Sequence, residues 1–192
     1  MMRTALIERR TRETDIRVEV CLDGGAVNID TGIGFFDHML TALGKHGGLG
    51  LTVTVKGDLE VDCHHTIEDT GIALGQAIRE ALGDMRGIRR YADCRIPMDE
   101  ALAECALDIS GRAYLVFNAA FENPACGGYD CCMTEEFMRA LAFNAGITLH
   151  LGCPYGRNDH HKIEALYKAF ARALREAVRI EGTEIPSTKG VL

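Results

Sequence analysis

Residues 62–69 read Asp-Cys-His-His-Thr-Ile-Glu-Asp, and residues 158–165 read Asn-Asp-His-His-Lys-Ile-Glu-Ala. In each stretch two adjacent histidines precede a glutamate by three and four residues, and each stretch opens a long segment whose apolar residues recur with helical spacing. One such stretch alone is typical of a helix start with histidines on its surface. Its recurrence at matching places in both halves of the chain instead indicates a duplicated set of metal ligands.

The spacing within each stretch predicts how the side chains point. On a helix, His64 and His65 lie four and three residues before Glu68, so both are neighbours of that carboxylate. Adjacent helical residues point roughly 100° apart, which favours two different ions over one shared ion. Imidazole mixed with carboxylate, and without thiolate, suits manganese, iron or zinc better than a structural zinc site. Two facing stretches therefore predict two metal ions, each ligated from both halves.

The repeat extends upstream of the histidine pairs. Residues 36–43 align with residues 135–141, which matches His38 with Glu136. These two potential ligands lie 98 positions apart, whereas the histidine pairs lie 96 apart, a difference that fits a shorter loop in the second half. The chain is therefore predicted to be a duplicated half-domain.

Each half is predicted to run as several strands followed by helix, strand and helix. Apolar alternation predicts strands at residues 2–10, 16–22, 51–55, 89–97, 102–109, 113–118 and 147–151. Helical spacing predicts helices at residues 36–45, from the first histidine pair to about 87, at 131–145, and from the second pair to 178. Because the helices need cover on one face, we expect an α+β fold with two sheets sandwiching a layer of four helices. Residues 1–192 are expected to form one domain built from repeats of about 1–87 and 88–192.

Composition excludes several classes of protein. The net charge of −7 and the pI near 5.5 argue against a nucleic-acid partner. The charged start lacks the apolar stretch of a signal peptide, and no run of residues is long and apolar enough for a membrane span. The eight cysteines are scattered without CxxC spacing, so we expect reduced thiols and a cytoplasmic location.

Outside the histidine stretches, a few polar positions can serve an anionic substrate. Glu13 lies between the first two predicted strands, and arginines stand at strand ends in the second half. The tail 186–190 combines hydroxyls, a cation and a flexible backbone, which can cradle a phosphate. Ordinary surface charges and a loose tail explain these residues equally well from position alone. His46 and His150 lack a carboxylate at ligand spacing and are read as structural.

Four longer motifs carry a resemblance to a known family. They are Gly-Phe-Phe-Asp-His-Met-Leu at 34–40, the first histidine stretch, Pro-Met-Asp-Glu-Ala-Leu at 97–102, and Pro-Ser-Thr-Lys-Gly at 186–190. With the second histidine stretch, they make residues 9–192 resemble the imidazoleglycerol-phosphate dehydratases of histidine biosynthesis. Ala92 and Ala113 depart from the family's pattern, where glycine and proline are expected, and each departure could alter a turn.

The resemblance implies a hydro-lyase that converts D-erythro-imidazole glycerol phosphate to imidazole acetol phosphate with two Mn²⁺ ions per active site. It implies metal ligands at His38, His64, His65, Glu68, Glu136, His160, His161 and Glu164. It implies substrate contacts from Glu13 and, at the phosphate, from Arg90, Arg112, Lys168, Ser187 and Lys189. The implied assembly is a homo-oligomeric shell of about two dozen chains, with active sites between subunits.

The mechanism that we expect begins with a substrate ring held as imidazolate between the two ions. This ring expels hydroxide to give a diazafulvene, and loss of the neighbouring proton then gives an enol that ketonises. Glu13 is the candidate to move a proton, with Glu164 or a metal-bound water as the alternative. Three rival readings stay open at this point: a dinuclear metallohydrolase, a non-enzymatic protein assembled by metal ions, and an RNA-binding module that the acidic charge disfavours.

Overall fold

The computed structural model describes residues 2–192, and its first half is a four-stranded sheet with two helices on one face. The elements are β1 (Thr4–Arg10), β2 (Thr14–Cys21), β3 (Val27–Asp30), α1 (Gly34–Gly47), β4 (Gly50–Gly57) and α2 (His64–Leu82). The strands lie in the order β1-β2-β4-β3, and only the β3–β4 pair is parallel. Both helices come after strands of the same sheet, as the sequence predicts.

The second half repeats this topology. Its elements are β5 (Tyr91–Met98), β6 (Ala101–Ile109), β7 (Tyr114–Asn118), α3 (Met133–Ala145), β10 (Ile147–Tyr155) and α4 (Asp159–Ala177). The sheet order is β5-β6-β10-β7, again with one parallel pair, β7–β10. A short hairpin of β8 (Ala125–Cys126) and β9 (Tyr129–Asp130) is the one insertion among the described strands. The predicted duplication of the half-domain is thus confirmed.

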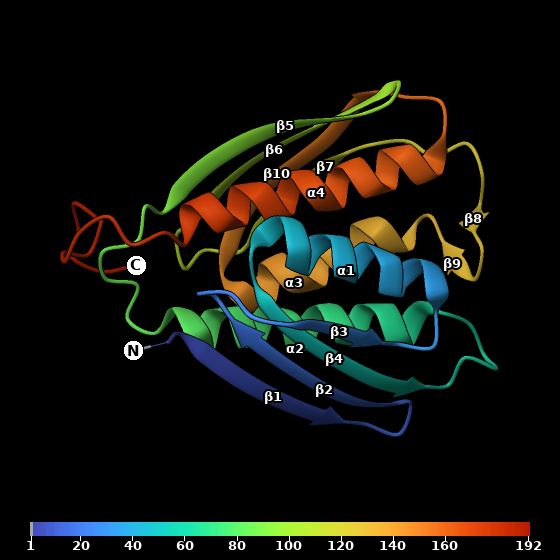
Figure 1. The fold of residues 1–192 in the computed structure, drawn as a ribbon, viewed down its shortest axis with the longest axis horizontal. Coiled ribbons are helices and arrows are strands. Elements are labelled where there is room, and N and C mark those ends of the chain that lie inside the picture. The colour runs from blue at the N-terminus through green and yellow to red at the C-terminus, as the bar shows by residue number, and fades with distance from the viewer. Residues whose placement is uncertain (1) are drawn as a thin grey trace.

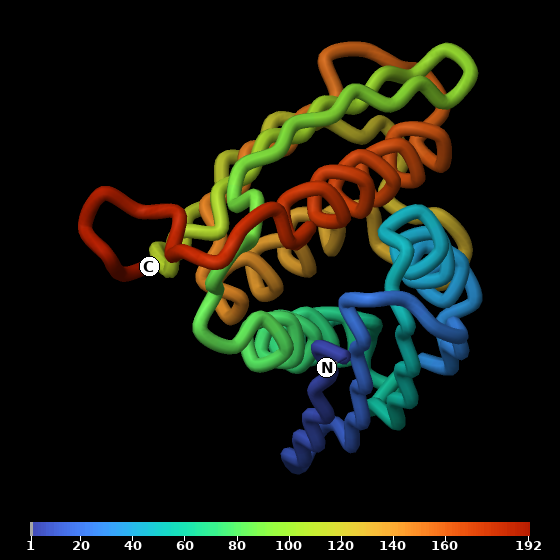
Figure 2. Tube along the Cα trace, turned by 60° about the vertical axis from the view of Figure 1, so that its left-hand side comes forward, coloured from blue at the N-terminus to red at the C-terminus, as the bar shows by residue number. Residues whose placement is uncertain are grey.

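The two sheets form the outer layers and the four helices lie between them (Figures 1 and 2). Helix α2 packs against α3, and α1 packs against α4, so each helix contacts a helix of the other half. The rings of Phe36, Phe137 and Tyr167 are fully buried in this layer, with centroids 5.3 Å apart in each neighbouring pair. The predicted α+β sandwich is confirmed. None of the helices in residues 2–192 is long and apolar enough to cross a membrane.

The elements differ from the sequence-based expectation at four places, one of which is strand β10, which ends at Tyr155 rather than at residue 151. Strand β3 was not predicted, because it is a four-residue edge strand whose apolar side chains are only half buried. Helix α2 ends at Leu82 rather than near residue 87, since Gly83 adopts a φ of 59° that stops the helix. The β8–β9 hairpin lies in a connection that the sequence predicts to be a loop.

The close approach of α2 and α3 depends on glycine. A Cβ atom added to Gly75 would lie 2.5 Å from the carbonyl oxygen of Leu141 and 2.8 Å from Cβ of Asn144. Alanine in a helix interior normally stabilises the folded protein by roughly 0.5–1 kcal/mol relative to glycine. Here the added Cβ would meet the backbone oxygen of Leu141, and no side-chain rotation can relieve that contact.

We therefore expect Gly75→Ala to lower the free energy of unfolding by about 1–3 kcal/mol, the usual cost of inserting extra atoms into a well-packed core. The shift of the urea midpoint measures this. Gly182→Ala is the matched control, because nothing lies within 4 Å of the Cβ that it would add. A midpoint for Gly75→Ala at or above that of the wild type would contradict the packing argument.

Candidate active site

The first cluster of predicted ligands joins the two halves of the chain. His38 extends from α1, and His160 and Glu164 extend from α4. The Nε2 atoms of His38 and His160 lie 3.3 and 3.1 Å from Oε2 of Glu164. One ligand atom from each of the three side chains lies within 4.8 Å of the others. The cluster forms because α1 packs on α4, which brings His38 beside a helix more than 120 residues later in the chain.

Glu164 is the negatively charged member of this cluster. Burial opposes its ionisation, but hydrogen bonds from Lys168 and His38 outweigh burial and lower the pKa of Glu164. Lys168 Nζ lies 2.6 Å from Oε1, which leaves Oε2 to face the two imidazoles. Two ligands that are about 2.2 Å from one ion and at right angles lie about 3.1 Å apart. The observed separations therefore fit a divalent cation held by one carboxylate and two imidazoles.

The second cluster is the counterpart from the other pair of helices. His64 and Glu68 extend from α2, with His64 Nε2 3.6 Å from Glu68 Oε2. Glu136, from α3, lines the same surface hollow as His64. Its carboxylate lies 3.7 Å from Arg139 Nε. These three side chains are less closely grouped than those of the first cluster, because their ligand atoms do not all lie within 4.8 Å of one another. With one imidazole and two carboxylates, against two imidazoles and one carboxylate in the first cluster, the second is the harder donor set.

His65 and His161 belong to neither cluster within one chain. The ring planes of His64 and His65 lie at 76° to each other, and those of His160 and His161 at 81°. Adjacent histidines thus diverge, as their spacing on a helix predicts. The Nε2 atom of His65 faces Glu13 at 4.0 Å, and that of His161 faces Asp99 at 3.6 Å.

Two carboxylates that the sequence analysis did not propose contact these divergent histidines. Asp58, just after β4, lies 3.0 Å from Nδ1 of His65, and Glu100, at the β5–β6 turn, lies 2.8 Å from Nδ1 of His161. The hydrogen bond to Asp58 raises the pKa of His65. Hydrogen bonds from the backbone of Asn158 and from His161 hold the pKa of Glu100 well below its usual range. No helical spacing links these residues to their histidines, because they lie on separate loops.

Four of the predicted phosphate-binding residues line one hollow beside the C-terminal tail. They are Arg90, Arg112, Ser187 and Lys189. Asp108 holds the Arg90 guanidinium with contacts of 2.7 and 3.2 Å, and the carbonyl of Pro186 accepts a third hydrogen bond at 2.7 Å. Arg90 thus connects the tail to the sheet. Lys189 has no ion-pair partner among residues 2–192, so its charge is available to an anion.

Lys168, the fifth predicted phosphate-binding residue, lies elsewhere. Its ammonium pairs with Glu164 and lies 3.5 Å from the sulfur of Met98. It does not line the hollow beside the tail. Its contact with phosphate therefore stays a prediction.

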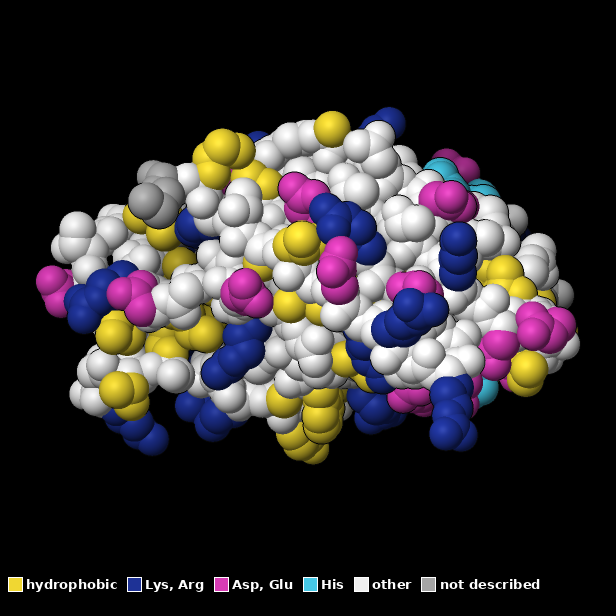
Figure 3. Space-filling model, turned by 90° about the horizontal axis from the view of Figure 1, so that it is seen from below, with side chains coloured by type: hydrophobic (Ala, Val, Ile, Leu, Met, Phe, Trp, Pro, Cys, Tyr) yellow, Lys and Arg dark blue, Asp and Glu magenta, His cyan; other side chains and the backbone are white. Residues whose placement is uncertain are grey.

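The metal-ligand clusters and the tail hollow lie at opposite ends of the folded subunit. His160 is in the first turn of α4, whereas the backbone N–H of Arg90 donates to the carbonyl of Ala177 at the end of that helix, at 2.9 Å. The 17 residues between them span about 25 Å at 1.5 Å per residue. Histidine and acidic side chains gather at the end where α2 and α4 begin, and the C-terminal tail folds at the other end (Figures 1 and 3).

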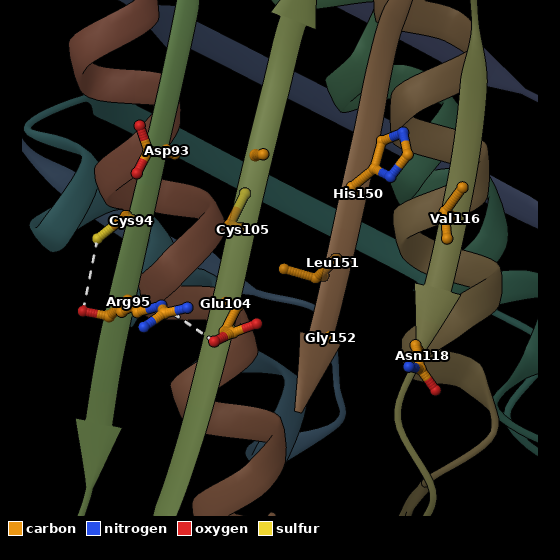
Figure 4. Close-up of a pocket in the computed structure, with 11 residues that line it drawn as sticks. Asp93, Cys94, Arg95, Glu104, Cys105, Val116, Asn118, His150, Leu151 and Gly152 are labelled. Carbon is orange, nitrogen blue, oxygen red and sulfur yellow. Dashed lines mark hydrogen bonds and ion pairs between the residues drawn. The ribbon is translucent and has the colours of Figure 1, made fainter. Parts of the chain in front are cut away.

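The remaining histidines lie outside both regions. His150 faces a hollow on the outer surface of the second sheet, near an Arg95–Glu104 ion pair of 3.0 Å (Figure 4). No second imidazole lines this hollow. Burial lowers the pKa of His46, and His46 makes no hydrogen bond with a carboxylate in the described chain. Neither His46 nor His150 lies with the predicted metal ligands, and their structural role stays a prediction.

Comparisons with known proteins identify relatives of the whole chain. A family model for imidazoleglycerol-phosphate dehydratase matches residues 31–174. The imidazoleglycerol-phosphate dehydratases of Methanococcoides burtonii and Methanosarcina barkeri are 59% and 56% identical, each over 100% of both chains. The crystal structure of the Staphylococcus aureus dehydratase superposes with a TM-score of 0.85 at 40% identity, covering 92% of this chain and 99% of that one. For the Pyrococcus furiosus enzyme the TM-score is 0.84 at 37% identity, with 97% and 100% covered. The chain therefore belongs to the imidazoleglycerol-phosphate dehydratase family.

Proposed function

We propose that the chain dehydrates imidazole glycerol phosphate to imidazole acetol phosphate with two Mn²⁺ ions, in sites shared between chains of a cytoplasmic homo-oligomer. The family supports the overall reaction, a hydro-lyase step of histidine biosynthesis. The separation of about 25 Å between the metal ligands and the tail hollow supports the shared site. A ring linked to a phosphate by a three-carbon chain cannot reach both ends of one subunit.

The donor groups fit two cations. Three of the eight predicted ligands, His38, His160 and Glu164, form a close cluster. His64 and Glu68 lie 3.6 Å apart beside Glu136 in a looser second cluster, and His65 and His161 turn their Nε2 atoms away from both. Each cluster would gain its fourth protein ligand from one of these histidines on a partner chain. Imidazole and carboxylate donors without thiolate suit Mn²⁺. When bound, the ions would act as Lewis acids that stabilise the substrate ring in its deprotonated form.

The side chains of the protein then have separate tasks. The substrate must lose a hydroxide next to the ring and a proton from the following carbon. Glu13 is half exposed, and its carboxylate points toward Nε2 of His65, so it is the better candidate to carry this proton. Glu164 is the alternative, but its two oxygens are already bonded to Lys168 and the imidazoles. Arg112, Ser187 and Lys189 would hold the phosphate and fix the distance from the ring to the base.

A subunit-mixing experiment tests the shared site. His161→Ala and Lys189→Ala alter opposite ends of the folded subunit. Oligomers that contain both variants should therefore have some sites with neither change. With equal amounts and random assembly, about a quarter of the sites would be intact. Activity is measured as kcat/KM at low substrate concentration. Formation of the keto product reports the loss of water. Mixed oligomers whose activity is only the average of the two parents would show that one chain builds the whole site.

Lys189→Ala should raise KM with little change in kcat. Loss of a charge-assisted hydrogen bond costs about 1.5–3 kcal/mol, so KM should rise about 10- to 100-fold. Steady-state kinetics measure both constants. Lys56→Ala, an exposed lysine on β4, is the control. An unchanged KM would remove the tail from the phosphate site.

A further inference from the structure

We propose that Asp58 and Glu100 are positioning residues, which hold His65 and His161 with Nε2 free to bind metal. This inference rests on the proposed function, because it concerns how two of the metal ligands are oriented. It assigns a task to two carboxylates that are not themselves metal ligands and that come from loops of different halves.

The hydrogen bonds determine which ring nitrogen carries the proton. A carboxylate only accepts, so Nδ1 of His65 and of His161 must be the N–H donor toward Asp58 and Glu100, at 3.0 and 2.8 Å. In a neutral imidazole the other nitrogen, Nε2, then has a lone pair. Metal-binding histidines are commonly fixed in this way by a carboxylate on the second nitrogen.

The other three histidines are arranged differently. His38 and His160 turn Nε2 toward Glu164, and His64 turns Nε2 toward Glu68. Their ligand partners are therefore already present in the same chain. The nearest carboxylates to Nε2 of His65 and His161 are Glu13 at 4.0 Å and Asp99 at 3.6 Å, and neither is a predicted metal ligand. The side chains of His65 and His161 are one-third and one-quarter exposed. A histidine that binds metal with a partner subunit needs its ring orientation fixed by a hydrogen bond to the other ring nitrogen. Among the described residues, only His65 and His161 have a carboxylate hydrogen-bonded to Nδ1.

The two carboxylates are themselves held to different extents. Oε1 of Glu100 accepts from the backbone N–H groups of Arg157 and Asn158, at 3.0 and 2.7 Å, while Oε2 faces His161. Both oxygens of Glu100 are thus committed as acceptors. Among residues 2–192 the Asp58 carboxylate is hydrogen-bonded only to His65, with its two oxygens 3.2 and 3.0 Å from Nδ1. Asp58 therefore has one oxygen to spare.

This difference predicts opposite behaviour of the amide variants. In Asp58→Asn the remaining oxygen can still accept from Nδ1, so metal binding should be retained. In Glu100→Gln the NH₂ group must face either a backbone N–H or the Nδ1–H of His161, and one of these contacts is lost. Glu100→Gln should then resemble Glu100→Ala, whereas Asp58→Asn should resemble the wild type and not Asp58→Ala.

The test measures Mn²⁺ affinity of the full-length protein by competition with a chelator, read from the electron paramagnetic resonance signal of Mn²⁺. Asp58→Ala, Glu100→Ala and Glu100→Gln should each lose about 10- to 100-fold in affinity, the usual effect of removing such a partner. Asp58→Asn should stay within about threefold of the wild type. Asp93→Ala, an exposed carboxylate on the outer sheet face, is the control. Melting temperatures of the metal-free proteins separate positioning from a loss of stability. That of Asp58→Ala should be unchanged, whereas Glu100→Ala also loses the backbone hydrogen bonds from Arg157 and Asn158.

Wild-type affinity in both alanine variants would overturn this inference and leave the proposed function standing. The same loss in Asp58→Asn as in Asp58→Ala would also overturn it, because charge and not orientation would then be the cause. Failure of the wild-type protein to bind Mn²⁺ would overturn the proposed function itself.

Discussion

Replacing His161 by alanine is expected to lower turnover about 1,000-fold and to reduce the metal content of the purified protein. The imidazole is half of a divergent pair whose other member, His160, contacts Glu164 within the chain. Removing His161 leaves that cluster intact but takes away the ligand offered to a partner subunit. Bound metal supplies several kcal/mol of charge stabilisation in the transition state, and roughly 4 kcal/mol corresponds to that factor in rate.

The experiment pairs steady-state turnover with elemental analysis of manganese. His150→Ala is the matched control, since its ring lies on the outer face of the second sheet, outside both clusters. It should keep both activity and metal content. Normal turnover in His161→Ala would exclude His161 as a ligand and would leave only the three-residue clusters as metal sites.

Glu13→Gln is expected to separate catalysis from metal binding. The carboxylate lies in the turn between β1 and β2, about half exposed, and its nearest imidazole contact is 4.0 Å, to Nε2 of His65. Glutamine has nearly the same shape but cannot carry the proton, so kcat should fall about 100- to 10,000-fold. Manganese content should match the wild type, because Glu13 belongs to neither three-ligand cluster.

Glu19→Gln on β2 is the control for loss of an exposed carboxylate from the same sheet, and it should leave kcat unchanged. Pre-steady-state measurement of product formation shows whether the chemical step is the one that slows. A normal kcat in Glu13→Gln would exclude Glu13 as the base and favour Glu164 in that role. A loss of manganese in that variant would make Glu13 a ligand and not a base.

Most of the fold could be predicted because the repeat occurs twice in the sequence. Strands such as β2 alternate strictly between buried and exposed residues, with Val18 and Val20 inside and Arg17 and Glu19 outside. Strand β3 was not found in this way, because its alternation covers only four residues at a sheet edge and includes two apolar side chains, both half buried. Its counterpart β7, one residue longer, was predicted.

The ligand types could be predicted, but not how they are grouped. Spacing along one helix relates His64 to Glu68 and His160 to Glu164, and both pairs are observed. The meeting of His38 with Glu164 depends on α1 packing across α4, a tertiary contact without any local signal. Asp58 and Glu100 were missed for the same reason.

Each three-ligand cluster draws residues from both copies of the repeat, because α1 lies on α4 and α2 on α3. Gene duplication ordinarily leaves one copy free to accumulate changes while the other keeps the original task. Under the proposed function, a substitution at a ligand position in either copy would disable a metal centre, so neither copy would be spare and selection would act on both. The copies do differ at one predicted ligand position, His38 against Glu136, but both residues there can bind metal, whereas the β8–β9 hairpin is found in the second half alone.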